Sequence, residues 1–106
     1  IGFWEDRPFL ALEYVEGGTL SRWLAARPAD AVEPVLRICV QLCEALEFLH
    51  SQGILHRDVK PDNVLMTGGG EVKLADLGLA RTTTGTALTE DGTIVGTLRY
   101  LAPEVL

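Results

Sequence analysis

The sequence predicts an α+β fold, in which helices and small strands occupy separate stretches of the chain. Two observations support this prediction. Apolar residues recur at helical spacing in one long stretch, and short apolar runs separated by turn residues follow Gly53. The chain has 106 residues, 47% of them apolar, so it can form one modest domain with a thin core and is too apolar for intrinsic disorder.

The first expected element is a largely buried strand over residues 9–15. This run is rich in leucine, aromatic and β-branched side chains, and a glycine pair ends it. A short helix is expected next, with Thr19 or Ser21 as its N-terminal cap. Pro28 should stop this helix, because proline lacks the backbone N–H that a helix interior needs.

The second helix is expected from Glu33 to about Ser51, with Gly53 as its C-terminal stop. Cys39 and Cys43 lie four positions apart on it, and we interpret them as buried packing residues rather than a redox or metal pair. The apolar positions that define the expected buried stripe are Leu36, Val40, Leu42, Cys43, Leu46 and Leu49.

Short strands are expected after this helix at residues 54–55, 64–66 and 72–74. The last two flank a glycine-rich stretch, residues 67–71, which predicts a hairpin because glycine supplies positive φ angles. A threonine-rich stretch over residues 82–93 follows, and one interpretation of it is simply a solvated loop.

Composition excludes several classes of protein. The 15 acidic and 9 basic side chains give a net charge of −6, which argues against a nucleic-acid partner. We find no apolar run long enough to cross a membrane, and two cysteines make no disulfide scaffold, so we expect a cytoplasmic location, with room for a membrane anchor outside these 106 residues in the full-length protein. The chain starts at Ile1 rather than methionine and stops at Leu106 without a tail, so we expect it to be a piece of a longer protein.

The most informative stretch lies at residues 56–63, where a loop presents Asp58, Lys60 and Asn63 together. A carboxylate can accept a hydroxyl proton, an ammonium group can meet a phosphate, and an amide oxygen can bind a hard metal ion. The expected hairpin returns the chain so that Asp76 can join Asn63 around a shared Mg²⁺. This set of groups predicts phosphoryl transfer.

Three motifs give the chain its resemblance to a known family. His56-Arg57-Asp58 with Asn63 matches the catalytic-loop pattern of protein kinases, and two further motifs occur as Asp76-Leu77-Gly78 and Ala102-Pro103-Glu104. The sequence therefore resembles the eukaryotic-type (Hanks-type) serine/threonine protein kinases, and its threonine- and glycine-rich loop is similar to that of bacterial members. Leucine stands where the family has phenylalanine in the second motif.

The resemblance covers nearly the whole chain and implies a partial protein-kinase-like fold. It implies the following segments: the end of the N-lobe and the hinge at 1–18, C-lobe helices at 19–53, the catalytic loop at 54–66, and the metal-binding motif with the activation segment at 72–106. ATP and Mg²⁺ are the implied cofactors, and the serine or threonine hydroxyls of proteins are the implied substrates.

Catalytic roles follow from the resemblance residue by residue. Asp58 would orient and deprotonate the substrate hydroxyl, and Lys60 would contact the γ-phosphoryl group. Asn63 and Asp76 would hold Mg²⁺. Lys60, two positions after the base, is the pattern of serine/threonine kinases.

The adenine side and the regulatory residues are also implied by the resemblance. Glu13 and Val15 would offer backbone groups to adenine, although Glu13 can also be read as a solvated carboxylate. Leu12 would be the gatekeeper and Leu65 the pocket floor. The proposed regulatory residues are Arg57, which would receive a phosphate from Thr89 or Thr93, and Thr97, which would bridge Asp58 and Lys60.

Other interpretations stay open at this point. The chain contains no glycine-rich phosphate loop and no ATP-clamping strand lysine, so we expect the 106 residues alone to be inactive. A pseudokinase or a regulatory, scaffolding module is the main alternative. A small-molecule phosphotransferase fits less well, because that group lacks the features seen here at Lys60-Pro61 and Ala102-Pro103-Glu104. We interpret His56 as a packed structural histidine rather than a proton carrier.

Overall fold

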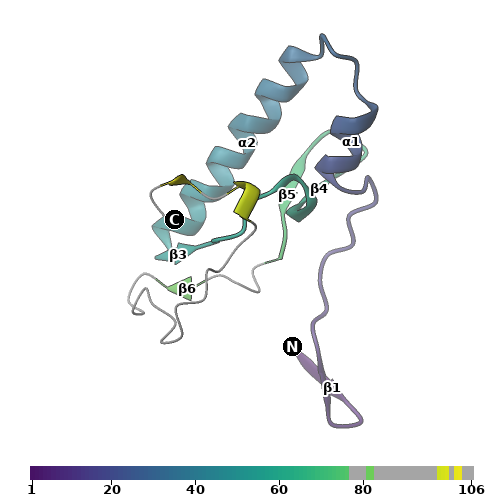
Figure 1. Cartoon of the computed structure of the whole chain (residues 1–106). Coiled ribbons are helices and arrows are strands. Elements are labelled where there is room, and N and C mark those ends of the chain that lie inside the picture. The colour runs from purple at the N-terminus through teal and green to yellow at the C-terminus, as the bar shows by residue number, and fades with distance from the viewer. Residues whose placement is uncertain (77–80, 83–97, 101, 104–106) are drawn as a thin grey trace.

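The structure, a computed structural model, describes residues 1–76, 81–82, 98–100 and 102–103 (Figure 1). The elements in chain order are β1 (Gly2–Trp4), β2 (Arg7–Phe9), α1 (Leu20–Ala26), α2 (Val32–Ser51), β3 (Ile54–Leu55), the 3₁₀ turn η1 (Pro61–Asn63), β4 (Val64–Met66), β5 (Val72–Leu74), β6 (Arg81–Thr82) and the 3₁₀ turn η3 (Leu98–Tyr100). Within these described residues the strands form three two-stranded antiparallel sheets, β1–β2, β3–β6 and β4–β5. The predicted α+β class is confirmed.

The N-terminal residues form a hairpin that the sequence did not predict. Strands β1 and β2 pair in antiparallel register, and the residues between them, Glu5 and Asp6, have φ angles of 46° and 61°. Two successive positive φ angles are typical of the tight turns that suit the twist of paired strands. The hairpin lies at the far end of an extended segment, away from both helices (Figure 1).

The expected buried strand over residues 9–15 is wrong. Only Phe9 belongs to a strand, and the side chains of Leu12 and Tyr14 are 80% and 87% exposed. In the described part of the chain no strand pairs with residues 10–15, and a strand needs pairing partners for its backbone groups. The apolar composition of residues 10–15 therefore predicted burial, but no described element covers this segment.

Helix α1 follows its predicted signals. Oγ1 of Thr19 accepts a hydrogen bond of 3.3 Å from the backbone N–H of Arg22, which is the interaction of an N-terminal cap. The helix ends at Ala26, shortly before Pro28, as expected. Leu20, at its first position, is buried.

Helix α2 has the predicted bounds within one residue, and it ends where Gly53, with a φ of 70°, donates its N–H to the carbonyl oxygen of His50 at 2.9 Å. The predicted buried face is only partly right. Ile38 is buried and Leu42 packs beside it, whereas these predicted stripe residues are exposed: Leu36, Val40 and Cys43.

Cys39, like Cys43, is exposed, so the interpretation of the two cysteines as buried packing residues is wrong. The helix carries apolar residues on more than one side. Spacing alone does not decide which side meets α1 and the β4–β5 hairpin.

The core lies where the β4–β5 hairpin packs against both helices (Figure 1). The hairpin and its strands at residues 64–66 and 72–74 are confirmed, with Val64 opposite Leu74 and Met66 opposite Val72. The buried cluster consists of Leu20, Ile38, Val64 and Met66, surrounded by Trp23, Leu24, Leu42, Val72 and Leu74. This packing fixes the hairpin whose ends carry the predicted site. No helix in the described ranges combines the length and apolar character that a membrane crossing requires.

Candidate active site

The loop after β3 places the predicted catalytic residues between two anchored elements. Pro61 occupies the first turn of η1, where its missing N–H costs nothing, and the N–H of Asn63 donates to the carbonyl oxygen of Lys60 at 2.9 Å. Strand β4 begins directly afterwards with Val64, the most deeply buried residue of the core cluster. Asn63 is itself buried, so the asparagine is held at the end of a packed strand.

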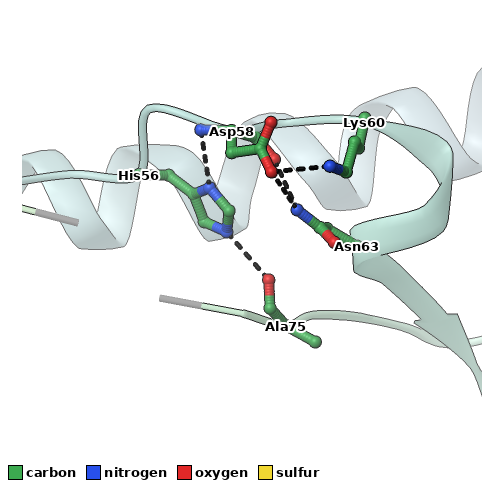
Figure 2. A network of polar contacts seen from close by, with 5 residues as sticks. All are labelled: His56, Asp58, Lys60, Asn63 and Ala75. Atoms are coloured by element: carbon green, nitrogen blue, oxygen red, sulfur yellow. Dashed lines mark hydrogen bonds and ion pairs between the residues drawn. The ribbon is translucent and has the colours of Figure 1, made fainter. Parts of the chain in front are cut away.

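The side chains of Lys60 and Asn63 both contact the carboxylate of Asp58 (Figure 2). Nζ of Lys60 lies 2.8 Å from Oδ2 of Asp58, and Nδ2 of Asn63 donates to the same oxygen at 2.9 Å. The same amide nitrogen also donates to the backbone carbonyl of Asp58 at 2.8 Å. The carboxylate is therefore oriented by two donors, one of them charged, and the loop around it is closed by the asparagine.

His56 connects the backbone of Asp58 to the backbone of Ala75 through hydrogen bonds. Its ring is only 2% exposed, its Nδ1 accepts a hydrogen bond of 3.3 Å from the N–H of Asp58, and its Nε2 lies 2.9 Å from the carbonyl oxygen of Ala75 (Figure 2). Because Nδ1 accepts, the ring proton lies on Nε2, which donates to Ala75. Both ring nitrogens are used in structural bonds, which fits the interpretation of His56 as a packed histidine.

Asp76 reaches the site through the hairpin. The N–H of Ala75 donates to the carbonyl oxygen of Asn63 at 2.8 Å, so the residue that follows lies beside the catalytic loop. Asp76 is exposed, and its negative charge contributes to the electrostatic environment of Lys60. The two turns that the sequence singled out therefore meet on one side of the molecule.

The donor set fits Mg²⁺. Both hydrogen bonds of Asn63 to Asp58 use Nδ2, so the amide oxygen is the atom of this side chain that could bind a metal ion, and Asp76 could add a carboxylate. Over residues 1–76 and the shorter described ranges, no three histidine, cysteine, aspartate or glutamate side chains gather as a protein-only metal cage would require. One or two oxygen ligands that leave positions for phosphates and water are typical of Mg²⁺ sites.

Two site residues have unusual backbone conformations. Arg57 and Asp76 have φ angles of 67° and 61°, in the left-handed region. Such conformations cost about 1–3 kcal/mol each and concentrate at functional sites. Residue type alone did not predict either conformation, because arginine is rare in this region and aspartate, although enriched there, occurs mostly in other conformations. Both residues lie directly next to the bonded groups, Arg57 before Asp58 and Asp76 after Ala75.

The charges of the site stabilise the protonated form of Lys60. Its hydrogen bond to Asp58 raises the pKa of Lys60 above the usual range. Partial burial opposes this rise, and the charges of Asp58, Asp62 and Asp76 add to it. The ammonium group is therefore fully charged at neutral pH.

The residues expected around adenine lie along the segment that leads into α1. Val15 and Leu65 are half-buried, and a backbone bridge joins Leu65 to Thr19. Leu12 and Glu13 are exposed, and the carboxylate of Glu13 lies 3.5 Å from Nζ of Lys73 on β5. The solvated carboxylate of Glu13 thus has a weak ionic contact with the hairpin.

Several expectations fall outside the described residues. These are the threonines of the predicted activation segment and parts of two motifs, namely Thr89, Thr93, Thr97, Leu77, Gly78 and Glu104. Arg57, the expected phosphate receiver, is described and half-buried.

The fold and the paired aspartate, lysine and asparagine define the class of protein. Residues 3–106 match the family described as "Protein kinase domain", and the chain belongs to this family. The resemblance inferred from the three motifs is confirmed, as is the partial kinase-like α+β fold.

Curated relatives agree with this assignment. The chain is 46% identical over 100 residues to the serine/threonine-protein kinase PknL of Mycobacterium tuberculosis, covering 92% of this chain and 24% of that protein. It is 36% identical over 104 residues to the probable serine/threonine-protein kinase PknB of Lactococcus lactis, covering 98% of this chain and 17% of that protein. It is 43% identical over 102 residues to the serine/threonine-protein kinase cds1 of Schizosaccharomyces pombe, covering 96% of this chain and 22% of that protein. The chain thus spans less than a quarter of the length of each of these relatives.

Proposed function

We propose that this chain supplies the hinge, the catalytic loop and the metal-binding turn of a serine/threonine protein kinase that transfers the γ-phosphoryl group of ATP to protein hydroxyls. The single observation that carries the proposal is the convergence of Lys60 and Asn63 on the carboxylate of Asp58. The three relatives are named as serine/threonine kinases, which supports the same activity. A cytoplasmic location, where ATP is available, fits this proposal.

The chemistry follows from what each group can do. Asp58 accepts the proton of the substrate hydroxyl as the oxygen attacks phosphorus, and its held orientation keeps the acceptor in line with that proton. Lys60 neutralises charge on the transferred phosphoryl group, which needs stabilisation more than covalent help. The leaving group is ADP, and the product is a phosphoserine or phosphothreonine side chain.

The cofactor side of the proposal uses residues at both ends of the hairpin. The amide oxygen of Asn63 and the carboxylate of Asp76 would hold Mg²⁺, which when bound neutralises the phosphate charges. The backbone groups of Glu13 and Val15 would meet adenine, with Leu12 behind it. Leu65, half-buried on β4, would form the floor under the base.

Regulation would act through Arg57. Its planar guanidinium group suits a doubly charged phosphate, and it lies directly before the catalytic aspartate. We propose Thr89 or Thr93 as the phosphorylated residue that meets it, and Thr97 as the residue that bridges Asp58 and Lys60.

The test is MgATP-dependent transfer by the complete protein that carries this sequence. A library of serine, threonine and tyrosine peptides with radiolabelled ATP should give labelled serine or threonine peptides. Nucleotide binding measured by calorimetry on the same sample separates the alternatives. Binding without transfer would favour the regulatory or scaffolding interpretation, and labelled tyrosine would contradict the assigned substrate class.

A further inference from the structure

Gln41, in the middle of α2, makes hydrogen bonds to the β4–β5 hairpin with both the nitrogen and the oxygen of its side-chain amide. Its Nε2 donates to the carbonyl oxygen of Gly70 at 3.3 Å, and its Oε1 accepts from the N–H of Val72 at 3.0 Å. A neutral amide is the side chain that offers one donor and one acceptor together. The pair of bonds therefore ties the closed end of the hairpin to the helix.

The hairpin is short, so its orientation depends on the elements that pack against it. Strands β4 and β5 have three residues each, so the hairpin is about 10 Å long, and an isolated hairpin of two strands is marginally stable in water. Its open end carries Asn63 and Asp76, because the N–H of Ala75 bonds to the carbonyl of Asn63. A tilt at the closed end would therefore shift the open end, where Asn63 and Asp76 lie.

The opposite edge of the hairpin is held at the same place. Met66 is the cross-strand partner of Val72, and its N–H donates to the carbonyl oxygen of Gly18 at 2.9 Å. The backbone of Gly17 approaches so closely that a Cβ atom there would collide with the carbonyl oxygen of Met66. One cross-strand pair is thus fixed from both sides, by the segment before α1 and by Gln41.

We propose that Gln41 is a positioning residue for the phosphoryl transfer reaction, and that it acts by setting the angle at which the hairpin presents Asn63 and Asp76 to Asp58. This inference rests on the proposed kinase function. It predicts that loss of the Gln41 bonds affects metal use before it affects recognition of the protein substrate.

The test compares three variants in the complete protein. Gln41→Leu removes both hydrogen bonds, and Gln41→Glu keeps the acceptor for Val72 while it loses the donor to Gly70. Arg37→Gln is the matched control, since Arg37 lies on the same helix, is 75% exposed and pairs only with Glu33 in the described structure. The readouts are the half-saturating Mg²⁺ concentration, the KM for ATP and the KM for a serine peptide.

The expected result is graded. Gln41→Leu should raise the half-saturating Mg²⁺ concentration and the KM for ATP about five- to tenfold, which is the size expected for one or two lost hydrogen bonds. Gln41→Glu should fall between the leucine variant and the wild type. The KM for the peptide should stay within about twofold in all variants, and Arg37→Gln should match the wild type in every readout.

Other outcomes overturn the inference or its basis. An active wild type with unchanged Mg²⁺ dependence in Gln41→Leu overturns the positioning role. The positioning role is also overturned if Gln41→Leu raises the half-saturating Mg²⁺ concentration and the KM for the peptide by the same factor and lowers the melting temperature, because this pattern shows general destabilisation. If Gln41→Leu fails to fold, Gln41→Glu decides by the same criteria. A wild type without any MgATP-dependent transfer overturns the proposed function itself, and the positioning role falls with it.

Discussion

Nζ of Lys60 lies 2.8 Å from Oδ2 of Asp58, and the two side chains are 22% and 9% exposed. An ion pair with one nearly buried partner is costly to break, because the remaining charge stays where water reaches it poorly. The pair also shares its acceptor oxygen with the amide of Asn63. The geometry of the carboxylate therefore depends on both donors.

Asp58→Asn should reduce phosphoryl transfer about 10²- to 10⁴-fold, because the variant loses the carboxylate that we propose as the acceptor of the hydroxyl proton. Steady-state transfer to a serine peptide measures this. Asp62→Asn is the matched control, since Asp62 lies in the same loop but is exposed and outside the bonded cluster. Equal losses in both variants would contradict the role assigned to Asp58.

The Lys60–Asp58 pair should stabilise the protein up to strongly alkaline pH. Because folding raises the pKa of Lys60, the stabilisation is fully present below the ordinary lysine pKa of about 10.4 and is lost as the pH rises through the higher folded value. The difference in melting temperature between the wild type and Lys60→Met should stay constant from about pH 7 to 9. It should then shrink above about pH 10.4, and a difference that already shrinks by about pH 8 would contradict the raised pKa.

Asp76→Asn should separate metal binding from backbone strain. Asparagine tolerates the positive φ of 61° at this position. The free energy of unfolding of the Asp76→Asn variant, measured in urea, should therefore match that of the wild type. Mg²⁺-dependent transfer should fall more than about tenfold, because the variant loses the charge of the carboxylate proposed to bind Mg²⁺. Asp76→Ala should lose activity similarly and also lose about 1 kcal/mol of stability. Full activity in the asparagine variant would rule out the metal-binding role.

Phosphorylation should act through Arg57. The double variant Thr89→Ala/Thr93→Ala and the single variant Arg57→Gln should each lower activity, and combining them should produce little further loss, because both remove the same contact. Transfer assays with phosphopeptide mapping measure this. Thr83→Ala serves as the control from the same threonine-rich stretch. Additive losses, or full activity in the double threonine variant, would contradict the coupling.

Gly17→Ala should destabilise the protein by about 2 kcal/mol or more. A Cβ at Gly17 meets the carbonyl oxygen of Met66, and backbone cannot move aside as a flexible side chain can. Gly69→Ala is the matched control, since a Cβ at Gly69 would have Oγ1 of Thr67 as its nearest neighbour at 3.8 Å, an ordinary contact. Urea denaturation compares the two, and similar stabilities would show that the segment before α1 does not press against β4 as described.

The elements with strong local signals were predictable from the sequence. Helix α2 follows from apolar spacing and a glycine stop, α1 from Thr19 and Pro28, and the β4–β5 hairpin from its glycine-rich turn. The meeting of the two turns at Asn63 and Asp76 followed from the same hairpin. Local chemistry suffices for the helices and for the turn of the hairpin, because each depends on neighbours within a few positions, and the hairpin then brings Asn63 and Asp76 together.

The features that depend on distant partners were not predictable. The exposed face of α2 and the exposed run at residues 10–15 are decided by which elements pack against them. The left-handed backbone of Arg57 has no signature in residue type. Gln41 is a polar residue on an amphipathic helix, which a sequence pattern assigns to solvent, although its amide bonds to a hairpin about thirty positions later.

The bond between Gly18 and Met66 also constrains how a growing chain acquires this site. Both helices lie between Gly18 and Met66 in the sequence, so during synthesis Gly18 leaves the ribosome well before Met66. Joining the two residues closes a long loop, which costs conformational entropy. Both helices can form early from local contacts, whereas the site proposed for the metal ion and the nucleotide is complete only after β5 has formed. A nascent chain interrupted before Val72 would thus contain both helices but lack Asp76, one of the two residues proposed to hold Mg²⁺.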